Sequence, residues 1–514
     1  MKAIKGEKEM KHMKKLTGVL LALVMTLSLA TTAFADETTY SITINNSAAG
    51  HTYEAYQIFT GDLSTNEAGH KVLSNIVWGS GISEAGKTAL GDAAAKAESL
   101  KTEADAKAFA KKVAAYLATA AGSANTVTDG KYVISGLAAG YYLVKDKDDS
   151  LSGDADAYTE YIIEVVDNAT AEPKSDVPEV EKKVKDINDS TDDAITDWQD
   201  SADHDIGDSV PFQLKATLAN NVSSYTTYKV VFHDTLSKGL TYNDDAKVYI
   251  DGKETSGFTV TSTVNADGTT TLTVSCDDVK ALGAGNSSVI TVEYTAMLNE
   301  NAVIGSAGNP NGVYLEYSNN PNKSEKENNE TGNTPKDTVI VFTYKTIINK
   351  VDGENNPLTG AEFKLEKFVA SEDGPETYKE VKGNWVEKSV TKNDKGTTFT
   401  FSGLDDGNYR LTETTTPAGY NTIAPIEFTI TAEHEIESDN PALTSLSGNA
   451  TNGEIKFTAD KDKGSLSSDV VNNAGATLPE TGGIGTTIFY VVGSILVLGA
   501  GVLLVTKKRM NSEK

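Results

Sequence analysis

The sequence predicts a mainly β protein that is built from β-sandwich domains in tandem. The chain has 514 residues, which is enough for several domains. Short runs rich in Val, Thr, Tyr and Phe alternate with Asn, Asp and Gly turns, and this pattern is typical of the strands of a sandwich. Away from the two ends of the chain, only the Ala-rich stretch 83–121 has a strong helical pattern. We therefore expect one helix added to the first domain of a β chain.

Composition excludes several classes of protein. The formal net charge is -27 and no long basic stretch occurs, which argues against nucleic acid as a partner. The single cysteine, Cys276, rules out an intramolecular disulfide. The six histidines are scattered without metal-ligand spacing, and the acidic stretches 145–156 and 186–193 lack the spacing of a calcium loop. We expect no cofactor and no metal, and solvated loops at both acidic stretches.

The first residues, 1–35, indicate a secretory signal peptide. Lysines precede an apolar run from Leu16 to about Ala30, and small residues follow at Ala33 and Ala35. This order predicts cleavage after Ala35, and the apolar run is too short for a stable membrane span. The sequence leaves three start positions open, namely Met1, Met10 and Met13.

The C-terminus combines three features in a fixed order. A pentapeptide, LPETG, precedes the uncharged stretch 484–506, which is long enough to cross a bilayer core of about 30 Å. A basic tail follows and would stop transfer across the membrane. A plain C-terminal membrane anchor explains the last two features and leaves the pentapeptide unexplained. The residues of the pentapeptide are Leu478, Pro479, Glu480, Thr481 and Gly482.

The order of these features resembles the cell-wall sorting signal of Gram-positive surface proteins. In that family a sortase cysteine attacks the carbonyl carbon of the threonine, here Thr481, and expels the glycine, here Gly482. An amine then resolves the acyl-enzyme. The resemblance implies a secreted chain that is tethered transiently in the membrane by 484–506 and is then anchored to the cell wall.

Between the two ends, the sequence divides into three domains. Residues 36–173 hold strands and the Ala-rich helix, and 174–334 hold only short β runs at regular spacing. A polar connector then leads to 335–477, which is again strand and turn. The sorting signal occupies 478–514.

The third domain carries a series of recognisable motifs. The stretches "NKVD", "PLTGAEFKL" and "GLDDGNYRLTETTTPAGY" follow one another and resemble the B-type repeat of collagen-adhesin (Cna) stalks. Together with the sorting signal, they make nearly the whole chain similar to sortase-assembled backbone (shaft, SpaA-type) pilins. The resemblance implies tandem immunoglobulin-like, Cna-type sandwiches.

Domains of this family typically contain a self-formed isopeptide bond between a core lysine and a core asparagine, assisted by an acid. Burial favours the neutral, nucleophilic form of lysine, and a buried carboxylic acid can shuttle the proton that leaves with ammonia. In the third domain the positions that match the family pattern are Lys350, Glu413 and Asn472. Strand alternation places each on an apolar face.

For the middle domain, the resemblance and strand alternation together favour Lys182, Asp234 and Asn319. A register shift of one residue would select Lys183 or Asn320 instead, so these alternatives stay open. The first domain offers no comparable set.

The resemblance also implies a lysine at the first domain junction that supplies the amine for polymerisation. Pro173 precedes Lys174 and stiffens the backbone there. By resemblance, Lys174 attacks the Thr481 acyl-enzyme of another subunit. Glu172 stands where the family usually has an apolar or aromatic residue, so the motif is degenerate.

The sequence therefore predicts the major structural subunit of a covalent cell-surface pilus that supports adhesion, and it predicts no enzyme. The expected partners are a pilus-specific sortase, identical pilin subunits, accessory pilins and peptidoglycan, with a host surface protein or glycan left open. Two alternatives share both ends of the chain without needing Lys174. They are a non-polymerising LPXTG wall-anchored adhesin and a minor tip or base pilin.

Overall fold

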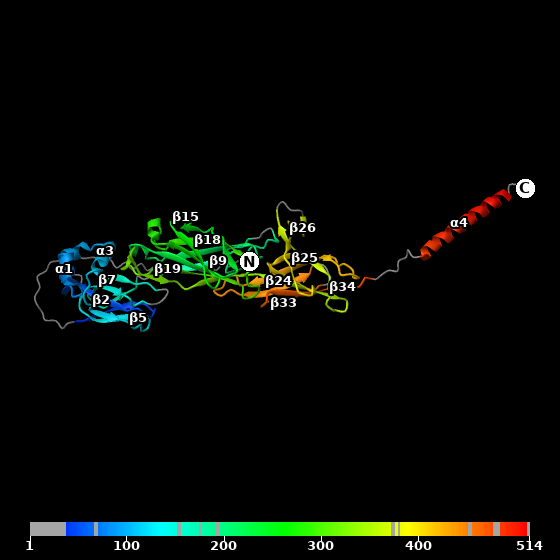
Figure 1. Cartoon of the computed structure of the whole chain (residues 1–514). Coiled ribbons are helices and arrows are strands. Elements are labelled where there is room, and N and C mark those ends of the chain that lie inside the picture. The colour runs from blue at the N-terminus through cyan, green and yellow to red at the C-terminus, as the bar shows by residue number, and fades with distance from the viewer. Residues whose placement is uncertain are drawn as a thin grey trace, which may run out of the picture.

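A computed structural model describes residues 38–65, 70–151, 156–173, 176–191, 195–371, 376–378, 381–450, 455–475 and 484–510. Three β domains follow one another in chain order, and the helix α4 (Ile484–Met510) comes after them (Figure 1). The predicted tandem β architecture is confirmed. Among the described residues, no helix is both long and apolar enough to cross a membrane, so the membrane span predicted at 484–506 stays a prediction.

The first domain combines two sheets with three helices. Its strands are β1 (Tyr40–Asn45), β2 (Tyr53–Thr65), β3 (Lys71–Trp78), β4 (Gly122–Ala124), β5 (Lys131–Leu137), β6 (Gly140–Asp146), β7 (Glu160–Val165) and β8 (Ala169–Ala171). One sheet has the order β5-β1-β8, and the other has the order β3-β2-β6-β7 with β4 beside β2. One apolar cluster lies between the sheets and a second lies under the helices.

The Ala-rich stretch forms three short helices, α1 (Glu84–Leu90), α2 (Ala93–Ser99) and α3 (Glu103–Ala114), where the sequence predicts one. Polar side chains cause the division, because each helix begins at a residue that accepts a hydrogen bond from its first turn. Asp92 accepts from the Ala95 amide, and a reciprocal capping box opens the third helix.

The middle domain is a sandwich of a seven-stranded and a six-stranded sheet. Its elements are β9 (Glu179–Val184), β10 (Ser201–Asp203), β11 (Ser209–Thr217), η1 (Val222–Ser224), β12 (Val230–Leu236), β13 (Leu240–Tyr242), β14 (Lys247–Ile250), β15 (Lys253–Thr255), β16 (Thr259–Val264), β17 (Thr270–Cys276), η2 (Val279–Leu282), β18 (Val289–Leu298), β19 (Asn309–Ser318), β20 (Ser324–Glu325), β21 (Asn328–Asn329), β22 (Thr331–Asn333) and β23 (Asp337–Phe342). The larger sheet has the order β10-β23-β19-β12-β17-β16, with β22 beside β19. The smaller sheet has the order β15-β14-β18-β11-β9, with β13 beside β18. β20 and β21 pair as a separate hairpin.

The C-terminal domain is a second sandwich. Its strands are β24 (Tyr344–Asp352), β25 (Glu362–Ala370), β26 (Glu376–Tyr378), β27 (Val381–Lys388), β28 (Thr391–Lys392), β29 (Thr398–Leu404), β30 (Gly407–Thr415), β31 (Ile426–His434), β32 (Leu443–Ala450), β33 (Thr458–Asp460) and β34 (Ser465–Asn472). The sheets have the orders β28-β29-β24-β34-β33 and β26-β27-β25-β30-β31-β32. The first strand, β24, and the last strand, β34, are parallel neighbours.

The boundary between the last two domains differs from the sequence-based division at 334/335. β23 pairs with β19 of the middle domain, and its Val339 and Val341 are buried in the middle core. The C-terminal core begins with Phe342 and Tyr344. The polar connector therefore does not mark the domain boundary, because the chain passes from the middle domain to the C-terminal domain inside a continuous β stretch.

Candidate functional site

The C-terminal domain buries a lysine amine between its first and last strands. Along β24, alternate residues face the core, and Lys350 is fully buried among them. The parallel register places Lys350 beside Val470, and the Nζ amine donates a hydrogen bond of 2.7 Å to the carbonyl oxygen of Val470. The amine therefore lies against β34, two residues before Asn472.

Asn472 and Glu413 complete this set. The Nδ2 amide of Asn472 donates to Glu413 Oε1 at 2.9 Å and to Oε2 at 3.1 Å. Both side chains are buried, and Asn472 Oδ1 has no hydrogen-bond partner among the described residues. The structure thus brings together the three residues that the sequence selected from strands far apart in the chain.

The environment of Lys350 favours a nucleophilic amine. Burial lowers its pKa to about 8, against an opposing effect of the Glu413 charge. An appreciable fraction of the amine is therefore neutral near physiological pH, and the neutral form is the one that attacks a carbonyl carbon.

The middle domain holds a second buried lysine. Lys182 is fully buried on β9, and its Nζ donates to Asp234 Oδ1 at 2.7 Å and to the Tyr294 hydroxyl at 3.1 Å. Burial lowers the pKa of Lys182 despite the charge of Asp234. The alternative residue Lys183 instead pairs with Asp200 at 2.5 Å, so Lys182 is the inward residue.

The asparagine beside this lysine is Asn311. Its Nδ2 donates to the Tyr294 hydroxyl at 2.8 Å, so amide and amine meet on one oxygen atom, and Tyr294 also donates to Asp234. Asn311 is fully buried, and its Oδ1 has no hydrogen-bond partner among the described residues. Asn472 in the C-terminal domain is likewise buried with an Oδ1 that has no partner among the described residues.

Asn319, which the sequence selected, does not lie in this cluster. It follows the end of β19, where its backbone carbonyl accepts from the Tyr158 amide at 2.7 Å and its own amide donates to Glu330 at 3.1 Å. Its neighbour Asn320 donates through its side chain to Glu330 at 2.7 Å. Both residues lie at the contact with the first domain, eight or more residues beyond Asn311 in the chain.

A sequence signal for Asn311 exists. In "NPNGVYLEY", Asn311 has the same parity as Val313, Leu315 and Tyr317, so it shares their inward face. Tyr294 is likewise in phase with the apolar residues of "SVITVEYTAML". Family resemblance drew attention to the end of the strand, whereas the pairing of Asp234 with Val313 places the acid near the start of β19.

The junction between the middle and C-terminal domains contains a third buried lysine. Lys367 donates to Asp205 and Asp405 at 3.0 Å each and also pairs with Asp189. Burial alone would lower the pKa of Lys367, but the surrounding acidic groups outweigh it and hold the pKa well above its usual value. This lysine stays charged, and no asparagine lies among its described contacts.

The acidic stretch 186–193 therefore differs from the solvated loop that the sequence predicts. Asp186 is buried, and the backbone carbonyl of Asp189 accepts from the Ala370 amide of the C-terminal domain at 2.7 Å. Burial and neighbouring carboxylates raise the pKa of Asp406, on the facing turn, to about 8. In the other acidic stretch, Asp146 is buried and contacts His51 at 2.8 Å.

The residues predicted to join subunits lie outside the described part of the chain. These are Lys174 and 478–482, so their roles stay predictions. Within the described part of the first domain, no buried lysine contacts an asparagine side chain.

Three family models match the chain. The prealbumin-like fold domain of SpaA matches 345–441, the Cna-B-like domain of Gram-positive pilin backbone subunit 2 matches 206–321, and the LPXTG cell wall anchor motif matches 470–512. These matches cover the two domains with buried lysine–asparagine sets and the sorting signal. The chain is a Gram-positive backbone pilin with an LPXTG anchor, as the sequence predicted.

Individual relatives agree with this class. The trypsin-resistant surface T6 protein of Streptococcus pyogenes serotype M6 is 24% identical over 398 residues, which are 66% of this chain and 70% of that protein. The solved T6 backbone pilin of serotype M6 S. pyogenes, described as a modular three-domain structure, has a TM-score of 0.54 at 17% identity, covering 86% of this chain and 100% of that one. The full-length major pilin SpaD from Corynebacterium diphtheriae has a TM-score of 0.47 at 19% identity, with 85% and 98% covered. The T6 pilin thus shares the fold.

Proposed function

We propose that this chain is the repeating subunit of a covalent pilus whose middle and C-terminal domains are each locked by one internal amide bond. The observation that carries the proposal is the pair of buried lysine–acid–asparagine sets, Lys350–Glu413–Asn472 and Lys182–Asp234–Asn311. A subunit that transmits tension needs a covalent connection between its first and last strands, and the parallel pair β24 and β34 is where such a bond resists extension.

The bond-forming step is the same in both domains. The neutral Nζ attacks the side-chain carbonyl carbon of asparagine, a C–N bond forms, and the bond to Nδ2 breaks. The neighbouring carboxyl group carries a proton from the amine to the departing nitrogen, which leaves as ammonia. In the middle domain, the Tyr294 hydroxyl connects amine, amide and acid, so it positions all three. The bond would form once in each of these two domains.

Subunits are joined between Thr481 of one copy and Lys174 of the next by a pilus-specific sortase. The anchor motif match at 470–512 supports cleavage there, and the uncharged stretch 484–506 with its basic tail would tether the substrate in the membrane until transfer. The last subunit would be passed to peptidoglycan. Accessory pilins and a host surface protein or glycan are further partners in this proposal.

Cell-wall extracts boiled in SDS test the polymer. The native chain should give a high-mass ladder. Lys174→Ala should give one anchored monomer band, and Thr481→Ala should lose both ladder and anchoring. Lys326→Ala, at an exposed lysine of the middle domain, is the matched control and should keep the ladder. A single monomer band from the native chain, or a ladder that survives Lys174→Ala, would contradict this assignment and favour a non-polymerising adhesin or a different lysine.

A further inference from the structure

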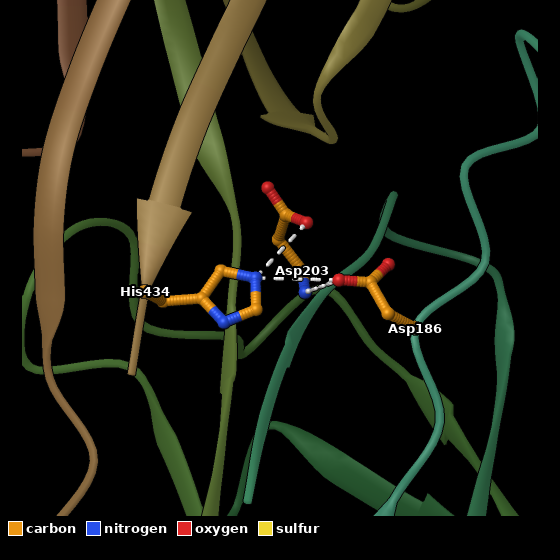
Figure 2. Close-up of side chains that lie close together, drawn as sticks. All are labelled: Asp186, Asp203 and His434. Carbon is orange, nitrogen blue, oxygen red and sulfur yellow. Dashed lines mark hydrogen bonds and ion pairs between the residues drawn. The ribbon is translucent and has the colours of Figure 1, made fainter. Parts of the chain in front are cut away.

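Two aspartates and a histidine converge where the middle and C-terminal domains meet. Asp186 follows β9, Asp203 ends β10, and His434 ends β31 of the other domain. His434 Nε2 lies 3.3 Å from Asp186 Oδ2 and 3.7 Å from Asp203 Oδ1, and the three potential ligand atoms all lie within 4.8 Å of one another. Figure 2 shows the imidazole edge directed between the two carboxylates.

Hydrogen bonds on the far side of the ring fix its orientation. The Ser201 hydroxyl donates its only hydrogen to the Glu435 carbonyl at 2.6 Å. It must therefore accept from His434 Nδ1, which lies 2.8 Å away. With Nδ1 carrying a hydrogen, Nε2 is the ring nitrogen that faces the two carboxylates. A histidine that ligates a metal is usually held in this way through its other nitrogen. Burial opposes the charged ring, but Asp186 and Asp203 raise the pKa of His434 to about 9, so a metal ion bound there would replace the Nε2 proton.

The spacing of the cluster suits a shared cation. A strong charge-assisted hydrogen bond between nitrogen and carboxylate is about 2.7–2.9 Å long, and both separations from Nε2 exceed this. Two ligands bound about 2.1 Å from one tetrahedral ion lie about 3.4 Å apart. The observed separations of 3.3 and 3.7 Å lie around that value.

One carboxylate also has an unused buried oxygen. The Asp203 side chain is 3% exposed. Its Oδ2 has no well-formed hydrogen bond among the described residues, and the Tyr344 hydroxyl, which interacts with Asp203, has none either. Asp405 and Asp406 of the C-terminal domain place carboxylate oxygens within 4.8 Å of Asp203. A buried, unpaired carboxylate oxygen among further carboxylates is costly unless a positive charge satisfies it.

We propose that Asp186, Asp203 and His434 bind one divalent transition-metal ion, such as Zn²⁺ or Mn²⁺, that bridges the two domains. Two carboxylates and one imidazole leave a fourth position for water or for Asp203 Oδ2. Ca²⁺ requires six to eight oxygen ligands, whereas the mixed nitrogen and oxygen set favours a transition metal. The ion would hold the junction where no internal amide bond crosses it.

Calorimetric titration of ZnCl2 into the chelator-treated full-length mature chain tests the site. The native chain should bind one ion, and its thermal unfolding midpoint should rise with ZnCl2. His434→Asn and Asp203→Asn should each weaken binding roughly tenfold or more. Asp186→Asn should also weaken zinc binding. Because the Asp186 side chain is the most exposed of the three, at 13%, this variant should disturb folding least.

A matched control is His233→Asn. His233 also pairs with a carboxylate, Glu316 at 2.9 Å, but lies on the middle sheet apart from this cluster. Zinc affinity should be unchanged in that variant. The proposal fails if the native chain shows no saturable zinc binding. It also fails if all three ligand variants bind as tightly as the native chain, or if CaCl2 binds more tightly than ZnCl2.

Discussion

Buried lysines inside the domains differ from the buried lysine between them. Burial lowers the pKa of Lys350 and of Lys182, although the charge of Glu413 acts on Lys350 and the charges of Asp234 and Asp337 act on Lys182. Lys367, at the junction, contacts three aspartates, and its pKa is raised well above the usual value. All three amines are fully buried, so burial alone does not make a lysine nucleophilic.

The difference lies in the number of neighbouring charges and in the presence of an asparagine. One or two carboxylates only partly offset the loss of hydration at Lys350 and Lys182, so a neutral amine stays accessible. Three carboxylates overcompensate and keep the ammonium form, which cannot attack a carbonyl carbon. The surroundings of Lys350 and Lys182 therefore suit the proposed amide bonds, whereas those of Lys367 suit ionic contacts.

The largest expected effect comes from removing the acid of the C-terminal set. Glu413→Ala should block the Lys350–Asn472 bond, so the intact mass should be higher by one ammonia after correction for the substitution. Losing the cross-link should lower the free energy of unfolding by about 4–5 kcal/mol, by analogy with the disulfide loop model. Glu387→Ala, at an exposed glutamate of the same domain, is the control. A normal ammonia loss in Glu413→Ala would show that the acid is dispensable.

A similar loss is expected in the middle domain and identifies its asparagine. Asn311→Ala should prevent ammonia loss there and lower the free energy of unfolding by about 4–5 kcal/mol. Asn319→Ala should leave the bond intact, because Asn319 lies outside the Lys182 cluster. Peptide mapping by mass spectrometry distinguishes the two. A cross-linked Lys182–Asn319 peptide would restore the assignment made from sequence.

The junction lysine should matter for stability without any covalent signature. Lys367→Ala leaves Asp189 and Asp405 without their cation, whereas Asp205 keeps its ion pair with Lys388 at 2.7 Å. The change should destabilise the protein by about 3–5 kcal/mol. Its mass should still show both ammonia losses. Urea unfolding and intact mass measure the two quantities, and Lys367→Arg should recover part of the stability. Loss of an internal bond in Lys367→Ala would break the distinction drawn between the two kinds of site.

The smallest effect is a pH dependence that appears only when Lys350 stays free. In Asn472→Ala the amine cannot react, and its folded pKa of about 8 lies below its unfolded value of 10.5. The folded state then binds fewer protons between these values, so stability should rise with pH from about 8 to 10.5, by at most about 3.4 kcal/mol. The bonded native chain lacks this titration. A flat pH profile in Asn472→Ala would mean that burial does not perturb the amine.

Local sequence patterns were sufficient for some features and insufficient for others. Period-two alternation placed Lys182 and Lys350 on inward faces, and the structure agrees. The same rule applied to "NPNGVYLEY" points to Asn311, but choosing it requires knowing which part of β19 pairs with Asp234. Asn311 and Asn319 lie on the same face of the strand by alternation, so only the strand register separates them. Register depends on contacts between distant parts of the chain, and the sequence alone therefore did not exclude Asn319.

By itself, the sequence determined the β class, predicted a signal peptide and a sorting signal at the two ends, and selected Lys350, Glu413 and Asn472, because each is encoded in a short motif or a local period. Tertiary structure decided the rest. It placed Asn311 and Tyr294 beside Lys182 and β23 in the middle sheet. It also brought His434 to Asp186, 248 positions earlier in the numbering. Such contacts depend on how whole sandwiches pair and dock, which no local pattern records.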